Sequence, residues 1–207
     1  MPRNRFLLVG LFLILLAIIY FSFFDSGNTD SPAVTNPETY RTEMATKRKE
    51  KDEFFRTSTE SPYTDKSKFK SLIYFNPDPN YRVSARLEPF ADRKKVVVKL
   101  TDGSEEVYEK YAHAVFTLHD EVCRLLVLKH DNTLSVLFKD KTSGKETYGG
   151  GRYLDFKPDD AKENRLLIDF NEAYNPYCAY NHEYACPLPP AENTLPVEVR
   201  AGEKYDQ

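Results

Sequence analysis

The strongest constraint on the fold is a period-two alternation of apolar and polar residues that begins after Ile73. In residues 81–90, for example, Val83, Ala85 and Leu87 occupy every second position, and such side chains lie on one face of a β-strand. Turn-forming residues recur about every 8 to 12 residues, which is typical of antiparallel all-β domains. The pattern therefore predicts a mainly β domain in which one face of each strand is buried.

We expect about eight or nine strands, connected by turns such as Asp102-Gly103. This pair is favoured in two-residue hairpins because Gly accepts a positive φ. An antiparallel barrel and a sandwich both fit such a set of strands. The expected strands are residues 81–90, 94–101, 106–111, 112–118, 122–129, 133–139, 152–157, 165–170 and 197–200.

One or two helices are expected before the first strand. Asn36 and Pro37 form a helix start, because Asn is a preferred N-cap and Pro is favoured at the first helical position. The charged residues 38–57 continue as a surface helix that docks by its C-terminal end. Its few apolar side chains are Tyr40, Met44, Phe54 and Phe55. A second short helical turn is expected within residues 65–72.

Residues 6–24 are an uncharged apolar run. As a helix, at about 1.5 Å of rise per residue, the run nearly matches a hydrocarbon core of about 30 Å. A secretory signal peptide is the alternative, but its apolar region normally has about 7 to 15 residues and a cleavage motif follows it closely. The best such motif, residues 31–33, is too far downstream. We therefore expect an uncleaved signal anchor in residues 1–24 and a transmembrane helix before the β-domain.

The flanking charges predict the orientation of this anchor. Arg3 and Arg5 precede the apolar run, whereas the first cation after it is Arg41, so the N-terminus stays cytoplasmic. The chain is then a single-pass membrane protein of the cell envelope, with its C-terminal part in the periplasm or another extracytoplasmic space. The expected parts are the anchor, a flexible linker at residues 25–37 and an exported domain at residues 38–207.

The charge balance argues against nucleic acid as a partner. The chain has 29 Lys and Arg against 32 Asp and Glu, a formal net charge of -3. It lacks the basic excess that binding to a phosphate backbone requires. An acidic surface is not held on anionic lipid by charge either, so the anchor is the only membrane contact that the sequence predicts.

Three consecutive glycines at residues 149–151 stand out in the second half of the chain. They supply no packing, so they indicate a bulge or a place where backbone or ligand approaches closely. Arg152 follows them and can hold a carboxylate or phosphate bidentately. A structural ion pair with Asp155 or Asp169 is the alternative for this arginine.

Cys178 and Cys186 are separated by seven residues. In an oxidising compartment such a pair favours a disulfide, which for a closed loop of about nine residues contributes roughly 2.5 kcal/mol. A metal site is the alternative, because His182 lies midway between the two cysteines. Zinc needs a fourth ligand, for which Glu183 and His130 are the candidates without a diagnostic spacing.

Tyrosines are concentrated around the same loop. They can form a stacking surface for a sugar or peptide, or they can simply pack over the loop. These residues are Tyr174, Tyr177, Tyr180 and Tyr184.

Three blocks occur in order that resemble the signature segments of an uncharacterised bacterial family, the domain of unknown function 1684. They read YFNPDPNYRVSARLEPF, DKTSGKETYGGGRYLDF and DFNEAYNPYCAYNHEYACPLPPAENTLPVEVRAGEK. The likeness covers about residues 40–204 and implies no assigned activity, substrate or catalytic residue, although members are often exported or membrane-attached. The matching positions are Tyr148, Gly149, Gly150, Gly151, Arg152, Asp155, Asp169, Asn171, Tyr174, Asn175, Cys178 and Cys186.

The leading functional hypothesis is a non-enzymatic, membrane-anchored envelope protein that binds a ligand or partner, such as an envelope protein, a peptide or a glycan. No nucleophile–base pair is recognisable, and no catalytic residue, cofactor or metal is assigned. One alternative is an enzyme or cofactor protein of unfamiliar type, in which Arg152, Asp155, Asp169 and Asn171 converge and a carboxylate acts as acid or base. Another is a purely structural envelope role, in which those residues serve the fold. The candidate ligand-binding residues are Tyr148, Gly149, Gly150, Gly151, Arg152, Asp155, Asp169, Asn171, Tyr174 and Asn175.

Overall fold

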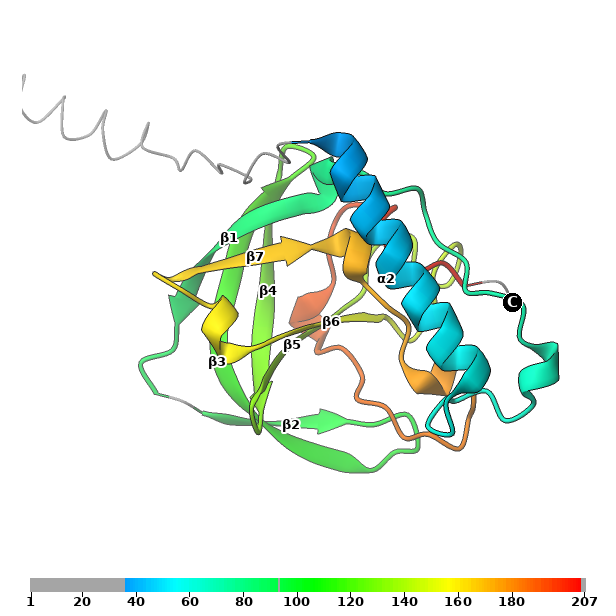
Figure 1. Cartoon of the computed structure of the whole chain (residues 1–207). Helices are drawn as coiled ribbons and strands as arrows, with labels where there is room; N and C mark the ends of the chain where they lie inside the picture. Colours follow the sequence, from blue (N-terminus) through cyan, green and yellow to red (C-terminus); the bar gives the residue numbers. More distant parts are fainter. Residues whose placement is uncertain (1–35, 93, 206–207) are drawn as a thin grey trace, which may run out of the picture. The chain divides into compact units, whose positions relative to one another are not determined.

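The computed structural model describes residues 36–92 and 94–205, which contain one α-helix followed by a curved antiparallel sheet (Figure 1). The helix is α2 (Pro37–Thr57), and the strands are β1 (Arg82–Pro89), β2 (Lys95–Lys99), β3 (Glu105–Leu118), β4 (Glu121–His130), β5 (Thr133–Phe138), β6 (Arg152–Phe156) and β7 (Arg165–Asp169). Short 3₁₀ turns are η1 (Lys66–Lys68), η2 (Pro79–Tyr81), η3 (Pro158–Asp160), η4 (Phe170–Glu172), η5 (Tyr177–Ala179) and η6 (Ala191–Asn193).

The sheet is a seven-stranded half-barrel with the order β6-β5-β4-β3-β1-β7, and β2 pairs with β3 outside this path. The long strand β3 pairs with β2 through its first part and with β1 through its second part. A register shift between Lys110 and Ala112 marks a β-bulge where one part gives way to the other, and bulges bend and twist a strand. The edge strands β6 and β7 do not pair with each other in the described chain, so the barrel is open on one side.

The inner face of the half-barrel holds the main core. The predicted alternation in β1 is confirmed, because Val83, Ala85 and Leu87 are all buried in this core. From the opposite strands, Leu125 and Val136 pack into the same cluster. The strand register therefore follows from which residues must leave water.

Helix α2 begins where the sequence predicts. The Asn36 side chain accepts hydrogen bonds from the backbone N–H groups of Glu38 at 2.9 Å and Thr39 at 3.3 Å, and Pro37 opens the helix. Docking is not confined to the C-terminal end of the helix, since its buried side chains are spread along its length. They are Tyr40, Met44 and Phe55. The second helical turn is the 3₁₀ turn η1, so the described chain has one α-helix.

The fold-class prediction is wrong about a transmembrane helix. Within residues 36–92 and 94–205, no helix is long and apolar enough to cross a membrane, and the α-helix found there carries charged side chains at about half of its positions. The predictions of membrane attachment, a single-pass topology and an extracytoplasmic location were derived from that helix. The described residues do not support them. The apolar run at residues 6–24 lies outside the described residues, and the predicted domain boundaries stay predictions.

Candidate functional site

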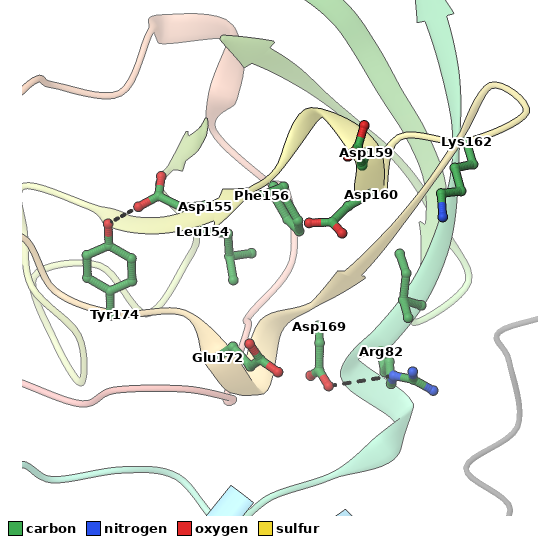
Figure 2. Close-up of a pocket in the computed structure, with 11 residues that line it drawn as sticks. Arg82, Leu154, Asp155, Phe156, Asp159, Asp160, Lys162, Asp169, Glu172 and Tyr174 are labelled. Atoms are coloured by element: carbon green, nitrogen blue, oxygen red, sulfur yellow. Dashed lines mark hydrogen bonds and ion pairs between the residues drawn. The ribbon is translucent and has the colours of Figure 1, made fainter. Parts of the chain in front are cut away.

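The open side of the half-barrel contains a cleft of about 540 Å³ between β6 and β7 (Figure 2). These strands follow each other in the chain and are joined by the turn η3, whose carboxylates lie beside the cleft. Ligand sites typically have volumes of about 300 to 1,000 Å³. The lining residues are Arg82, Leu154, Asp155, Phe156, Asp159, Asp160, Lys162, Leu167, Asp169, Glu172 and Tyr174.

The cleft combines an apolar surface with an acidic surround. Leu154, Phe156 and Leu167 supply the apolar part. Five carboxylates and two cations lie around them, which gives the lining a formal charge of −3. Such an excess raises the local concentration of cations. The carboxylates are Asp155, Asp159, Asp160, Asp169 and Glu172, and the cations are Arg82 and Lys162.

Asp155 and Tyr174 form one wall of the cleft. The Tyr174 hydroxyl and the Ser135 hydroxyl each donate a hydrogen bond to the Asp155 carboxylate. Tyr174 is held in place because its backbone pairs with Tyr153 of β6 through bonds of 2.9 and 3.0 Å. Burial, reinforced by the neighbouring Asp155 charge, raises the pKa of Tyr174. This phenol therefore stays protonated and acts as a hydrogen-bond donor.

Asp169 lies at the opposite wall, where β7 ends. Its Oδ1 accepts hydrogen bonds from the Asn171 backbone N–H at 3.0 Å and from Asn171 Nδ2 at 2.9 Å. The Tyr40 hydroxyl of α2 donates to the same carboxylate at 3.0 to 3.1 Å, and Arg82 Nε lies 3.8 Å away. Burial and the Asp169 charge raise the pKa of Tyr40. Asp169 therefore fastens the helix to the edge of the cleft.

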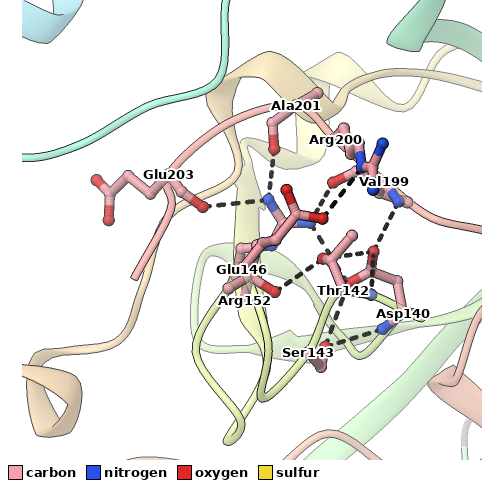
Figure 3. A network of polar contacts seen from close by, with 10 residues as sticks. Asp140, Thr142, Ser143, Glu146, Arg152, Val199, Arg200, Ala201 and Glu203 are labelled. Carbon is pink, nitrogen blue, oxygen red and sulfur yellow. Dashed lines mark hydrogen bonds and ion pairs between the residues drawn. The ribbon is translucent and has the colours of Figure 1, made fainter. Parts of the chain in front are cut away.

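Arg152 does not line the cleft and lies in a buried network instead (Figure 3). It is 1% exposed, and its guanidinium donates to the backbone oxygens of Val199 at 2.8 Å, Glu203 at 3.3 Å and Ala201. Asp140 lies 3.5 Å from Arg152 Nη2. Burial lowers the pKa of Arg152. The structure thus places this arginine as a tie between β6 and the C-terminal segment.

The glycines before β6 make room for the chain itself. Gly151 has a φ of 97°, and a Cβ there would lie 2.7 Å from the Phe138 carbonyl oxygen and 2.6 Å from Pro189 Cγ. A Cβ on Gly150 would lie 2.3 Å from the ring of Tyr148. At position 151, only Gly avoids both the strain of a positive φ and the clash of a Cβ with its neighbours. The structure brings neither glycine to the cleft.

The two asparagines also bridge chain segments. Asn171 pairs with the backbone of Asp78, accepting at 2.9 Å and donating at 2.8 Å. Asn175 Nδ2 donates to the Lys204 carbonyl oxygen at 2.9 Å. Three of the ten candidate residues line the cleft, namely Asp155, Asp169 and Tyr174. The four residues of the enzyme alternative do not converge there, because Arg152 and Asn171 lie elsewhere, and ligand binding by the other candidates stays a prediction.

The predicted disulfide is wrong, because Cys178 and Cys186 are free thiols. They interact by hydrogen bonds instead: the Cys178 backbone N–H donates to Cys186 Sγ at 3.2 Å. A hydrogen bond from the Cys186 thiol lowers the pKa of Cys178 to about 7, and the same bond raises that of Cys186. The described residues contain no cluster of three or more metal-ligating side chains.

Several cleft residues were not singled out from the sequence. Asp159, Asp160 and Lys162 belong to the stretch KPDDAKEN, which connects the strands expected at residues 152–157 and 165–170. Its density of charge beside an edge strand is the signal that could have found them. Arg82 and Glu172 carry no such signal, because only the fold brings β1 and η4 to this place.

Comparison with known proteins places the chain in a family. The model of the family described as "Protein of unknown function (DUF1684)" matches residues 67–204. The chain belongs to the DUF1684 family. The solution NMR structure of an uncharacterised protein from Haloarcula marismortui is 38% identical, covers 81% of this chain and 95% of its own, and has a TM-score of 0.64.

These comparisons confirm the family resemblance but do not show the bacterial origin attached to it. No curated protein matches the chain. The half-barrel of this DUF1684 protein therefore has a solved relative, whereas its function must be argued from the cleft.

Proposed function

We propose that this DUF1684 protein is a ligand-binding module, and that the cleft between β6 and β7 takes a small organic cation with an apolar portion. The observation that carries the proposal is the combination of a 540 Å³ cleft with apolar side chains and a carboxylate excess at the open side of the sheet. A cleft with a purely structural role would not require both the apolar side chains and the carboxylate excess.

The position of the cleft supports this function. It is lined by two edge strands that the rest of the sheet holds in place, so its walls are preformed. Preformed sites avoid the ordering cost that a flexible site incurs on binding. Leu154 and Phe156 offer apolar contact for a ligand's body, and the aromatic face of Phe156 suits a cationic group.

The carboxylates at the rim of the cleft differ in how the protein engages them. Lys47 pairs with Glu172 at 2.5 Å, and the Asp160 carboxylate accepts the Lys157 backbone N–H at 2.8 Å. Asp159 is exposed on the same turn and lines the cleft. Neutralising Asp159 therefore weakens attraction to a cation without removing a structural contact.

Calorimetric titration of the full-length chain with tyramine tests the proposal. Tyramine has an ammonium group and an aromatic body, and 4-hydroxyphenylacetate is an anion of similar size and shape. We expect tyramine to bind at least about tenfold more tightly than the anion, because the lining has a net negative charge. The substitution Asp159→Asn should weaken tyramine binding about two- to fivefold, as expected for one partly exposed charge.

Asp131→Asn is the matched control, since Asp131 has a 92% exposed side chain outside the cleft. It should leave tyramine affinity unchanged. Equal binding of the cation and the anion, or equal effects of the two substitutions, would overturn the proposal.

A further inference from the structure

A second, smaller cavity of about 230 Å³ lies under the middle of α2. It shares Glu172 and Tyr174 with the cleft, but its other charged residues differ. Three cations from the helix and two carboxylates line it, so its formal charge is +1. The charged residues are Lys47, Arg48, Lys51, Glu172 and Glu203.

Both carboxylates in this cavity are already paired with lysines. Lys47 Nζ lies 2.5 Å from Glu172, and Lys51 Nζ lies 2.5 Å from Glu203. Glu203 is 1% exposed and also accepts hydrogen bonds from the Asn175 backbone N–H and the Tyr180 hydroxyl, each at 2.8 Å. Neither carboxylate is therefore free to form an ion pair with Arg48.

Arg48 has buried donors without acceptors. Its guanidinium lies over the Tyr74 ring, with Cζ 4.4 Å from the ring centroid. Its Nε and Nη2 are buried and have no hydrogen-bond partner within the described residues. These two N–H groups point in parallel from one edge of the guanidinium, which is an edge that binds an oxyanion bidentately.

Tyr74 adds a third donor at the same place. Its hydroxyl is buried close to Glu203 and makes no hydrogen bond of good geometry in the described chain. Burial and the nearby Glu203 raise the pKa of Tyr74, so the hydroxyl keeps its proton. Leaving buried donors unpaired costs about 1 to 3 kcal/mol each, a cost that a bound acceptor removes.

We propose that Arg48 and Tyr74 form a binding site for a single oxyanion, the carboxylate or phosphate group of a small ligand. Arg48 contributes Nε and Nη2 and Tyr74 contributes its hydroxyl, whereas the charge of Lys51 is offset by Glu203. Arg48 and Tyr74 line this cavity and not the cation cleft, although the two cavities share Glu172 and Tyr174. One can therefore fail while the other stands.

Titration of the full-length chain with inorganic phosphate, followed by the ¹⁵N-resolved Arg48 Nε–H signal, tests this site. We expect a saturable shift of that signal and none with chloride at equal ionic strength. A parallel acetate titration compares the two oxyanion classes, and the tighter binder identifies which group the site prefers. Saturation by either one supports the site.

Substitutions assign the donors, with affinities measured by calorimetric titration because Arg48→Gln removes the Arg48 Nε–H signal. Arg48→Gln should lower the affinity for the preferred oxyanion at least tenfold, and Tyr74→Phe about three- to tenfold while keeping the ring under Arg48. Lys49→Gln makes the same charge change at an exposed neighbour outside the cavity and should alter the affinity less than twofold. The proposal is overturned if neither oxyanion saturates the shift, or if Lys49→Gln and Arg48→Gln have equal effects.

Discussion

The cleft at the open side of the half-barrel and the buried network around Arg152 use charged residues in opposite ways. In the network, one guanidinium binds three backbone oxygens and lies near one carboxylate, out of contact with water. In the cleft, carboxylates outnumber cations beside a solvent-accessible space. Buried charges must be satisfied within the protein, whereas charges at a rim remain available to a ligand. Exposure at the rim, as at Asp159, rather than residue type, separates a binding from a structural role.

The largest effect should come from Arg152→Ala. This change leaves the carbonyl oxygens of Val199 and Ala201 buried without their donor and removes the counter-charge beside Asp140. We expect a loss of about 3 to 5 kcal/mol in the free energy of unfolding, measured by urea denaturation. A loss below about 1 kcal/mol would show that the network is not what fastens the C-terminal segment.

A pair of glycine substitutions tests the close packing beside this network. Gly151→Ala and Gly103→Ala both put Ala at a positive φ, 97° and 86° respectively, but only position 151 has atoms within contact distance of the new Cβ. Gly103→Ala should cost about 1 to 2 kcal/mol through the backbone alone. Gly151→Ala should cost about 2 kcal/mol more because of the clashes. Equal losses in urea denaturation would contradict this reading.

The Cys178 and Cys186 thiols should make the stability of the folded chain depend on pH. The pKa of Cys178 is lowered to about 7 in the folded chain from 9.0, whereas that of Cys186 is raised. Between about pH 7 and 9 the unfolded chain holds one more proton than the folded chain, so stability rises with pH, by about 1 to 2 kcal/mol. Above about pH 9 the unfolded chain loses both protons while Cys186 keeps its own, so stability falls again.

This thiol prediction is checked by urea denaturation across the pH range with Cys178→Ser as the control. The variant should lose the rise between about pH 7 and 9. A rise of the same size in the variant would assign it to other groups.

The smallest effect on stability is expected in the cleft. Asp159→Asn and Lys162→Gln should each change the free energy of unfolding by less than about 0.5 kcal/mol, because both side chains belong to exposed residues. A loss above about 1 kcal/mol in urea denaturation would mean that the rim charges serve the fold, and the contrast with Arg152 would disappear.

Local signals in the sequence predicted much of the fold. The Asn36 cap and the alternation in β1 work within a few residues, so they can be recognised without knowing the tertiary structure. The strands expected at residues 106–111 and 112–118 are one strand, β3, because the bulge between Lys110 and Ala112 interrupts the pattern without ending the ladder. Residues 197–200 alternate like a strand, but the Asp140 carboxylate and Arg152 bind Val199 instead of a neighbouring strand.

The candidate site was harder to predict because it depends on long-range contacts. Arg152 and Asp155 are three residues apart in β6, yet one is buried in the network and the other faces the cleft. Strand alternation puts them on opposite faces, but no local pattern tells which face the C-terminal segment covers. The membrane helix and the disulfide were predicted from local signals too, and the described structure contains neither.

Cation binding in the cleft between β6 and β7 is tested most directly by mapping where a cation binds on the chain. In a ¹H–¹⁵N titration of the full-length chain with tyramine, we expect saturable shifts in β6, in β7 and at the η3 turn between them, and no shifts around Val199 to Ala201. Shifts outside the cleft, or the same shifts with 4-hydroxyphenylacetate, would contradict the assignment of the open side of the half-barrel as a cation-binding site.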